Sequence, residues 1–452
     1  MRNRPIILFA ALIWLATLSA QASAESLIKR GAPVRQGRAW VESYECNAPA
    51  REGGKLILRA DTGSIRIKTS GAGNRVECRL ILQAYTESEK QARQMLDGYV
   101  LSARSIEGGG VYINGESSGS SHHRRFLGVG VNITLPARNS LGAEFDITLP
   151  ARYNLDVETQ GGEIGIEGNL QGEARLTTAG GDIRSADISG PVRVETAGGS
   201  ITLGNLGVRA EVRTAGGSIH TGNVRGEAKL ETSGGEIEVG QVGGSLRAET
   251  AGGDVVIGRA TGQIVAETAG GQILLGPASS SVRAETAGGS IHLQGGRGQV
   301  VAETAGGSID LLQVEAGVRA STAAGRILAQ FNADAKTFAA SRLETSSGDI
   351  FVYLPTGLPL TIDAAIDAAA GHRIITDFPL SIQGAREDFN ERTIRGRGAL
   401  NGGGEVLRIR TVAGNIEIRK LDPRKLQDLI NQEQSSWNRW QERQAKKEQR
   451  QR

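Results

Sequence analysis

Histidines, cysteines and regularly spaced carboxylates are the side chains in this sequence that could do chemistry. The 452 residues include only five histidines and two cysteines. His220 and His292 occupy equivalent places in a repeat, but they are four repeat units apart. In a stack of strands about 4.8 Å apart, these side chains would be about 19 Å from each other, too far to share an ion. We therefore predict no metal site.

Signatures of an enzyme are also missing from the sequence. It contains no G-x-S-x-G, P-loop or zinc-protease motif. Its formal charge of +3 is nearly balanced, which argues against a strongly basic nucleic-acid binder. We predict no catalytic residue, no cofactor and no enzymatic activity, and no nucleic acid among the partners.

Glutamates recur at fixed spacing through the middle of the chain and form a predicted outward column. Stacked carboxylates repel one another and could recruit cations, but basic residues stand two positions earlier in several repeats. We favour a solvent-facing ladder of ion pairs, each contributing about 0–1 kcal/mol. The glutamates are Glu195, Glu231, Glu249, Glu267, Glu285 and Glu303, and the basic residues are Arg193, Lys229, Arg247 and Arg283.

The two cysteines, Cys46 and Cys78, both lie near the start of the chain. In an oxidising compartment we expect them to pair and to close a loop of about 32 residues, a link worth about 3–4 kcal/mol. Two separate buried thiols remain the alternative. The sequence has no C-x-x-C motif that would indicate thiol exchange.

A strict repeat determines the predicted architecture. The motif E-T-A-G-G-x-I-x-L recurs with its threonine at eight successive intervals of 18 residues, and a period this regular indicates stacked structural units. Thr159 precedes the run by 19 residues and Thr345 follows it by 23. The threonines of the run are Thr178, Thr196, Thr214, Thr232, Thr250, Thr268, Thr286, Thr304 and Thr322.

Alternation within each unit predicts strands. In the segment 282–286, Val282, Ala284 and Thr286 share one side, whereas Arg283 and Glu285 share the other. Each unit is thus predicted to be a strand, a tight Gly-Gly turn, a second strand and a looser bend. We expect the glycine pairs to allow positive φ. The predicted fold is all-β, a parallel β-solenoid with 18-residue coils, a strand-rich N-terminal cap and a C-terminal helix.

Composition shifts divide the chain into five predicted segments. Residues 1–24 resemble a signal peptide, because positive residues, an apolar stretch and Ala22-Ser23-Ala24 follow one another. An N-terminal membrane anchor is the alternative; no later apolar run is long enough to span a membrane. Residues 25–151 are predicted to form the cap. It includes a short helix, which begins at a predicted capping box of Thr86 and Glu89. Residues 152–355 form about eleven coils, 356–421 irregular final coils, and 422–452 a basic helical tail.

Two apolar features lie outside the predicted interior. Val256, Val265, Leu274 and Val301 occupy columns where other coils carry polar or charged residues, so they are a candidate contact patch for self-association or a partner. In the tail, a narrow helical stripe could pack on the end of the solenoid or dock elsewhere, on anionic lipid, polymer or a partner. The stripe consists of Leu426, Leu429, Ile430, Trp437 and Trp440.

The motif Glu-Thr-Ala-Gly-Gly-Ser-Ile, after a leader and a short strand-rich segment, resembles a bacterial "putative adhesin" family of unknown function with toast-rack β-solenoid repeats. The resemblance extends from about 60–65 (Ala-Asp-Thr-Gly-Ser-Ile) to 411–416 (Thr-Val-Ala-Gly-Asn-Ile). It implies contact with a surface or envelope ligand and supplies no catalytic residues.

These observations predict a non-catalytic exported envelope protein, periplasmic, surface-located or secreted, whose solenoid presents a repetitive surface as an adhesin or scaffold. Its ligand would be an envelope polysaccharide or protein. The alternative is an envelope-stress or regulatory module that docks a membrane-associated partner through the C-terminal helix. A carbohydrate-active enzyme is a distant third hypothesis.

Overall fold

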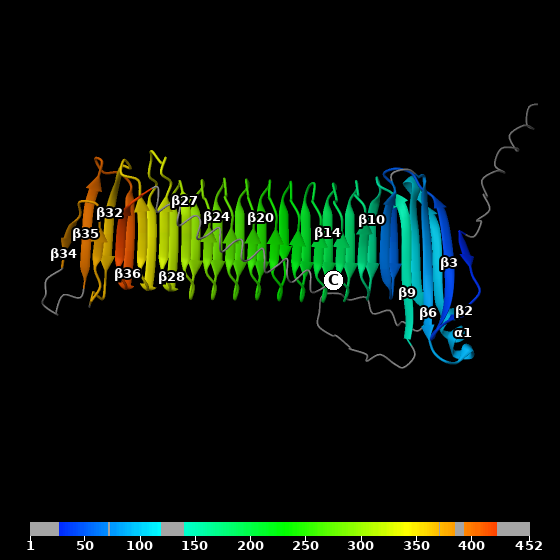
Figure 1. The fold of residues 1–452 in the computed structure, drawn as a ribbon. Coiled ribbons are helices and arrows are strands. Elements are labelled where there is room, and N and C mark those ends of the chain that lie inside the picture. Colours follow the sequence, from blue (N-terminus) through cyan, green and yellow to red (C-terminus); the bar gives the residue numbers. More distant parts are fainter. Residues whose placement is uncertain (1–26, 71–72, 119–139, 370, 385–392, 423–452) are drawn as a thin grey trace, which may run out of the picture.

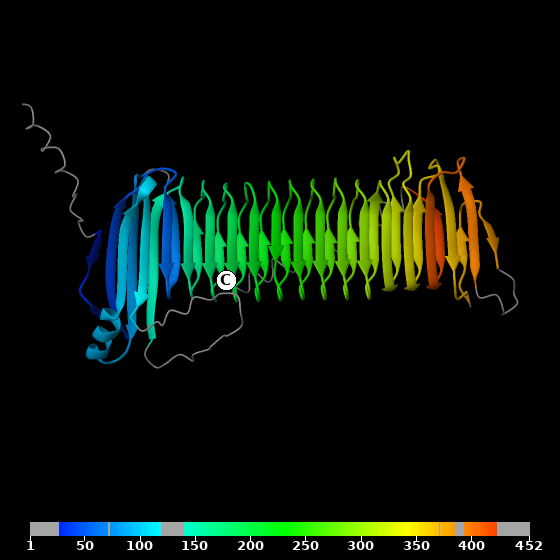
Figure 2. The same cartoon turned by 180° about the vertical axis from the view of Figure 1, so that it is seen from behind.

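The computed structural model describes residues 27–70, 73–118, 140–369, 371–384 and 393–422. The described residues are 57% strand and 3% helix, arranged in two long sheets in which parallel pairing dominates. Strands from the two sheets alternate along an uninterrupted rod (Figures 1 and 2). The predicted all-β solenoid is confirmed.

One sheet, which we call the threonine sheet, contains the strands that carry the repeated threonine. Neighbouring strands are parallel and in register, so Thr159 pairs with Thr178 and Thr178 with Thr196. Eleven of its strands belong to the threonine repeat. The strands are β10 (Asn154–Thr159), β12 (Ala174–Thr178), β14 (Val192–Thr196), β16 (Ala210–Thr214), β18 (Ala228–Glu231), β20 (Leu246–Thr250), β22 (Ile264–Thr268), β24 (Val282–Thr286), β26 (Val300–Thr304), β28 (Val318–Ala324) and β30 (Ser341–Ser347).

The other sheet, which we call the isoleucine sheet, contains the shorter strands that follow the glycine pairs. Its strands also stack in parallel, Ile273 pairing with Ile291 and Ile291 with Ile309. They are β11 (Ile164–Glu167), β13 (Ile183–Ser185), β15 (Ile201–Leu203), β17 (Ile219–Thr221), β19 (Ile237–Val239), β21 (Val255–Ile257), β23 (Ile273–Leu275), β25 (Ile291–Leu293), β27 (Ile309–Val314), β29 (Ile327–Phe331) and β31 (Ile350–Leu354).

The rod interior is filled by the inward positions of both sheets. Val282, Ala284 and Ile291 are each 1–2% exposed, so the alternation read from the sequence is confirmed. A third column of buried residues closes the coil, through single bridges such as Ile188 to Leu206. Because the interior is narrow, it holds small aliphatic side chains.

The repeated threonines face this interior and hydrogen-bond along the stack. Thr250 Oγ1 donates to the carbonyl oxygen of Gly235 in the preceding coil at 2.7 Å, and it accepts from the amide of Gly253 at 3.3 Å. The same pair of bonds recurs from Thr196 to Thr304 in every coil. Each buried hydroxyl is therefore satisfied, which removes the cost of burying it.

The repeated glycine pairs are needed for a different reason from the one predicted. Gly198, Gly199, Gly288 and Gly289 are not among the residues with positive φ, so the expectation of left-handed backbone there was wrong. A Cβ on Gly289 would instead lie 1.9 Å from the carbonyl oxygen of Gly271 in the preceding coil. The second glycine is required because the turns of successive coils touch.

The N-terminal segment joins the same two sheets. Strands β4 (Lys55–Ala60) and β5 (Ser64–Ser70) form a coil that pairs in parallel with β10 and β11. On their other side lie β8 (Gly110–Ser117) and β9 (Ser140–Pro150), so both sheets continue across the boundary expected at 151. The remaining elements are β1 (Ile28–Arg30), β2 (Val34–Gln36), β3 (Ala39–Pro49), β6 (Arg75–Tyr85), β7 (Tyr99–Ile106) and the 3₁₀ turn Glu107–Gly109.

The predicted short helix is present as α1 (Glu89–Asp97), but the predicted capping box is wrong. The N-cap residue is Ser88, and no side chain caps the helix. Thr86 instead donates from Oγ1 to Gln91 Oε1 at 2.9 Å. The capping pattern therefore located the helix correctly and gave the wrong contacts.

At the far end, the last strands of the chain are inserted into the stack. Strand β36 (Val406–Ala413) lies between β30 and β32 (Leu360–Ile366), in parallel with both, and Thr411 pairs with Thr345. Strands β35 (Ile394–Leu400) and β34 (Ser381–Gln383) then add in antiparallel fashion. In the isoleucine sheet, β37 (Ile416–Lys420) lies between β31 and β33 (Ile374–Thr376).

Candidate functional site

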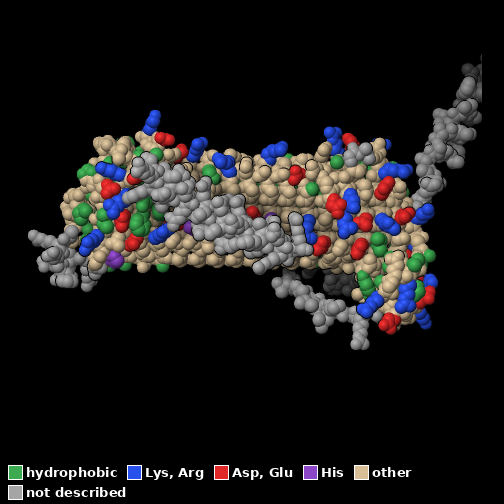
Figure 3. All heavy atoms as spheres, viewed as in Figure 1, with side chains coloured by type: hydrophobic (Ala, Val, Ile, Leu, Met, Phe, Trp, Pro, Cys, Tyr) green, Lys and Arg blue, Asp and Glu red, His purple; other side chains and the backbone are tan. Residues whose placement is uncertain are grey.

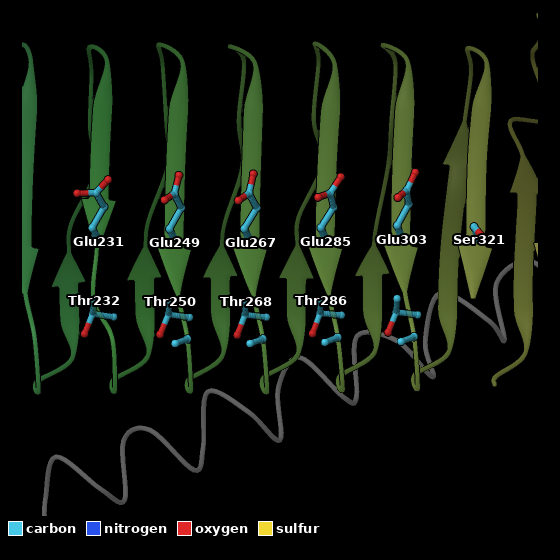
Figure 4. Close-up of a pocket in the computed structure, with 15 residues that line it drawn as sticks. Glu231, Thr232, Glu249, Thr250, Glu267, Thr268, Glu285, Thr286, Glu303 and Ser321 are labelled. Carbon is cyan, nitrogen blue, oxygen red and sulfur yellow. The ribbon is translucent and has the colours of Figure 1, made fainter. Parts of the chain in front are cut away.

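A shallow groove runs along the outer face of the threonine sheet. It has a volume of about 720 Å³ and is lined by the same three residue types in successive coils: a glutamate, the repeated threonine and the following alanine. Figure 4 shows the glutamates Glu231, Glu249, Glu267, Glu285 and Glu303 in one row, with the threonines in a second row beside them. The predicted glutamate column therefore forms one wall of a repetitive surface.

The N-terminal part of this column is an ion-pair network. Arg193 contacts Glu195 at 2.6 Å and Glu211 in the next coil at 3.1 Å. Arg213 contacts Glu211 at 2.7 Å and Glu231 at 2.6 Å. The predicted ladder of ion pairs is present in these coils. Lys and Arg side chains also lie beside Asp and Glu side chains elsewhere on the surface, as on the face that Figure 3 shows.

The network holds Glu231 in its charged form. Burial alone would raise the pKa of this carboxyl group, but the hydrogen bonds and charges of Lys229 and Arg213 lower the pKa below its ordinary value. The same contacts raise the pKa of Arg213, chiefly through its hydrogen bond to Glu231.

Toward its C-terminal end, the glutamate column has fewer basic partners. Valines replace the basic residue at Val265 and Val301, two positions before Glu267 and Glu303. Among the residues that the structure describes, Glu267 forms an ion pair only with Arg247 of the preceding coil, at 3.4 Å. No described residue forms an ion pair with Glu303 within 4 Å. The groove is therefore more acidic at this end than in its N-terminal coils.

The four residues predicted as a contact patch lie on two different faces. Val256 and Leu274 pair with each other on the isoleucine sheet. Val265 and Val301 lie on the threonine sheet, in register on either side of Arg283. The expectation of one patch is thus wrong, since the two arms of a coil face opposite sides of the rod. Whether either pair mediates contacts stays a prediction.

His220 and His292 lie in one outward column of the isoleucine sheet and contact carboxylates. His220 Nδ1 is 3.1 Å from Glu238 Oε2, and His292 Nδ1 is 3.3 Å from Asp310 Oδ2. Burial would raise the pKa of Asp310, but His292 and Arg326 lower it below the ordinary value. Sequence reasoning missed this buried carboxylate, because its partner Arg326 belongs to the next coil. No group of three or more His, Cys, Asp or Glu side chains suited to a metal occurs within the described ranges.

Cys46 and Cys78 are directly opposite each other on the antiparallel strands β3 and β6, and each is 3% exposed. Both are thiols in this structure. The pKa of the Cys78 thiol is raised by its hydrogen bond with Cys46 and by burial. Sequence position alone did not establish this pairing, and the disulfide itself stays a prediction.

We expect protein made in an oxidising compartment to contain no free thiol after unfolding in guanidinium. Replacing both residues (Cys46→Ala with Cys78→Ala) should then lower the free energy of unfolding by about 3–4 kcal/mol. Thiol titration of the unfolded chain and urea denaturation measure the two effects. Two reactive thiols in protein prepared without reductant would contradict the link; cytoplasmic protein provides the reduced control.

The leader (residues 1–24) and the stripe Leu426, Leu429, Ile430, Trp437 and Trp440 lie outside the described residues. Among the helices that the structure describes, none is long and apolar enough to cross a membrane.

Part of the chain is similar to a known family. Residues 117–295 match the family model described as Toastrack DUF4097. The resemblance seen in the repeat motif is thereby confirmed. No curated protein matches the sequence.

Three solved structures are similar to the chain at low identity. A "putative cell adhesion protein" from Clostridium sporogenes is 11% identical, covers 83% of this chain and 99% of its own, and has a TM-score of 0.14. A "putative adhesin" from Bacteroides fragilis is 11% identical, with coverage of 84% and 97% and a TM-score of 0.22. A "putative lipid binding protein" from Parabacteroides distasonis is 15% identical, with coverage of 69% and 94% and a TM-score of 0.20. At these TM-scores the likeness carries no argument about this chain.

Proposed function

We propose that this chain is a non-catalytic exported envelope protein that uses the groove on the threonine sheet to hold an extended, repetitive surface ligand, as an adhesin or scaffold does. The observation that carries the proposal is the repetition of the groove. Its lining recurs in successive coils from Glu231 to Glu303, so it offers equivalent carboxylates at a spacing of about 4.8 Å.

A polymer suits such a surface better than a small molecule does. The groove is shallow and continuous through the coils of Glu231 to Ser321, whereas small-molecule sites are enclosed and lined mainly by apolar side chains. Its carboxylates can accept hydrogen bonds from the hydroxyl groups of a polysaccharide or from the amides of an extended protein segment. Export is supported by the leader-like residues 1–24.

The proposal is tested by blocking the groove. We expect the exported chain to begin at Glu25, as mass spectrometry would show, and to co-sediment with isolated bacterial sacculi or envelope vesicles. The variant with Ala269→Arg and Ala287→Arg places two long side chains in the groove, where both alanines are exposed. We expect it to lose about tenfold or more of its retention, equivalent to about 1.4 kcal/mol.

Val208→Arg is the matched control, because Val208 is 48% exposed and is not among the groove residues. Equal retention of the groove variant and the control would contradict the proposed use of the groove. An N-terminus at Met1 in the purified protein would contradict the proposed export.

A further inference from the structure

Part of an outward column of the isoleucine sheet is buried although it points away from the core. We call it the outer column. Val256 is 2% exposed, Leu274 8% and Leu328 7%. Val256 and Leu274 form a cluster of their own, separate from the rod interior. The members pair successively in register: Glu238, Val256, Leu274, His292, Asp310, Leu328 and Phe351.

The burial is confined to one part of the rod. In earlier coils the equivalent outward positions are Arg184 and Thr202, and both are exposed. Asp310, in the middle of the column, is 3% exposed, and its Oδ1 has no hydrogen-bond partner among the described residues. A segment that covers this column should be apolar opposite Val256 and Leu274 and again opposite Leu328, and polar opposite Asp310 between them.

The described chain ends beside this column. Strand β37 is the neighbour of β31 in the isoleucine sheet, and the amide of Leu421 donates to the carbonyl oxygen of Leu354 at 2.8 Å. Asp422, the last described residue, thus follows a strand that is the direct neighbour of the strand carrying Phe351. Residues 423–452 follow it.

The apolar residues of this C-terminal segment match the outer column in spacing. As a helix with a rise of about 1.5 Å per residue, the segment would place Leu426 about 6 Å from Asp422, Leu429 and Ile430 about 11–12 Å, and Trp437 and Trp440 about 22–27 Å. Strands spaced about 4.8 Å apart place Phe351 and Leu328 about 5 and 10 Å from β37, and Leu274 and Val256 about 24 and 29 Å.

The polar residues match as well. Between the two apolar groups of the segment stands the run 431–436 (Asn-Gln-Glu-Gln-Ser-Ser), and between the two apolar parts of the column stand Asp310 and His292. Beyond Trp440, residues 441–452 contain five basic and two acidic residues, and the column continues beyond Val256 to Glu238. The order of apolar, polar and charged residues in the C-terminal segment thus matches their order in the outer column.

We propose that residues 423–452 fold back in cis as an amphipathic helix along the outer column, with Leu426, Leu429 and Ile430 over Phe351 and Leu328, and Trp437 and Trp440 over Leu274 and Val256. The column is the docking surface, and the occupant is the chain's own C-terminal segment. This interaction is independent of the groove, which lies on the other sheet.

Tryptophan fluorescence of the mature full chain tests the proposal. After Trp40→Phe, the only tryptophans of residues 25–452 are Trp437 and Trp440. We expect blue-shifted emission that acrylamide quenches weakly. Val256→Lys with Leu274→Lys should shift the emission to the red and raise quenching about threefold or more, because the apolar cover is lost.

Val265→Lys with Val301→Lys is the matched control, since these valines are half-buried on the opposite sheet. It should leave emission and quenching unchanged. Thermal unfolding followed by circular dichroism identifies variants that fail to fold. Equal quenching in all three proteins, or strong quenching in the unchanged chain, would overturn the proposal.

Thiol labelling gives a second measurement that does not need charged substitutions. The introduced thiol of Leu274→Cys should react slowly in the full chain and at least about tenfold faster when Trp437→Ser and Trp440→Ser are added. Light scattering should give a monomer mass for each protein. A dimer that Leu274→Lys dissociates would show that a second copy covers the column, and would overturn docking in cis.

Discussion

Replacing Gly289 by alanine should destabilise the middle of the rod by about 3 kcal/mol, at the upper end of the usual cost of overpacking. The added Cβ would lie 1.9 Å from the carbonyl oxygen of Gly271 and 2.4 Å from its carbonyl carbon. Backbone atoms on both sides are fixed by the register of the two sheets, so the coils have to separate. We expect a lower urea midpoint and faster hydrogen exchange in the coils on either side.

Gly288→Ala is the matched control. A Cβ there would lie 3.5 Å from the nearest atom, the carbonyl oxygen of Gly270, which is ordinary van der Waals contact. We expect this variant to unfold within about 0.5 kcal/mol of the unchanged protein, as surface substitutions usually do. Equal midpoints for the two variants would show that contact between coils does not select the second glycine.

Tyr153→Ala should cost about 3–5 kcal/mol, the range for truncating a buried aromatic side chain. Tyr153 is fully buried where the N-terminal segment meets the first coil, and its hydroxyl donates to the carbonyl oxygen of Gly109 at 2.8 Å. Its ring also packs so closely on Gly54 that a Cβ there would be 2.6 Å from Cε2. Urea denaturation measures the loss of stability.

Two further variants separate the contributions of Tyr153. Tyr153→Phe keeps the ring and should cost only about 1 kcal/mol for the lost hydrogen bond, because the carbonyl oxygen of Gly109 still accepts from the amide of Arg51 at 3.3 Å. Tyr85→Ala removes a tyrosine that is 44% exposed, and should change stability by about 0.5 kcal/mol or less. If Tyr153→Ala unfolds the N-terminal segment while the rod stays folded, the segment is a separate folding unit. In that case the strand pairing across residue 151 contributes little to the free energy of unfolding.

The repeat fixed most of the fold in advance because period and parity are local properties. An 18-residue spacing determines which residues stack, and alternation determines which of them face inward, so the interior around Val282 and Ile291 could be predicted. The reason for the second glycine could not, because it depends on atoms of Gly271 in another coil. The insertion of β36 was not predictable for a related reason: where the period breaks, chain order no longer gives spatial order.

The candidate site was predictable only in part. The glutamate column and its basic partners follow from the spacing, and the pairs at Arg193 and Lys229 are present. The groove itself depends on the exposed alanine after each threonine, such as Ala287, whose role has no signature in sequence. Dividing the four outward apolar residues between two sheets required knowing which arm of the coil each occupied.

The position of β36 sets the order in which the far end of the molecule can be assembled. Its place between β30 and β32 means that β32 has no parallel neighbour until residues 406–413 have been delivered. During synthesis from the N-terminus, the nascent chain would have unpaired strand edges on β30 and β32 until residues 406–413 had been made. Premature termination would leave those edges open to pairing with other chains, so completion of synthesis and protection from aggregation are coupled.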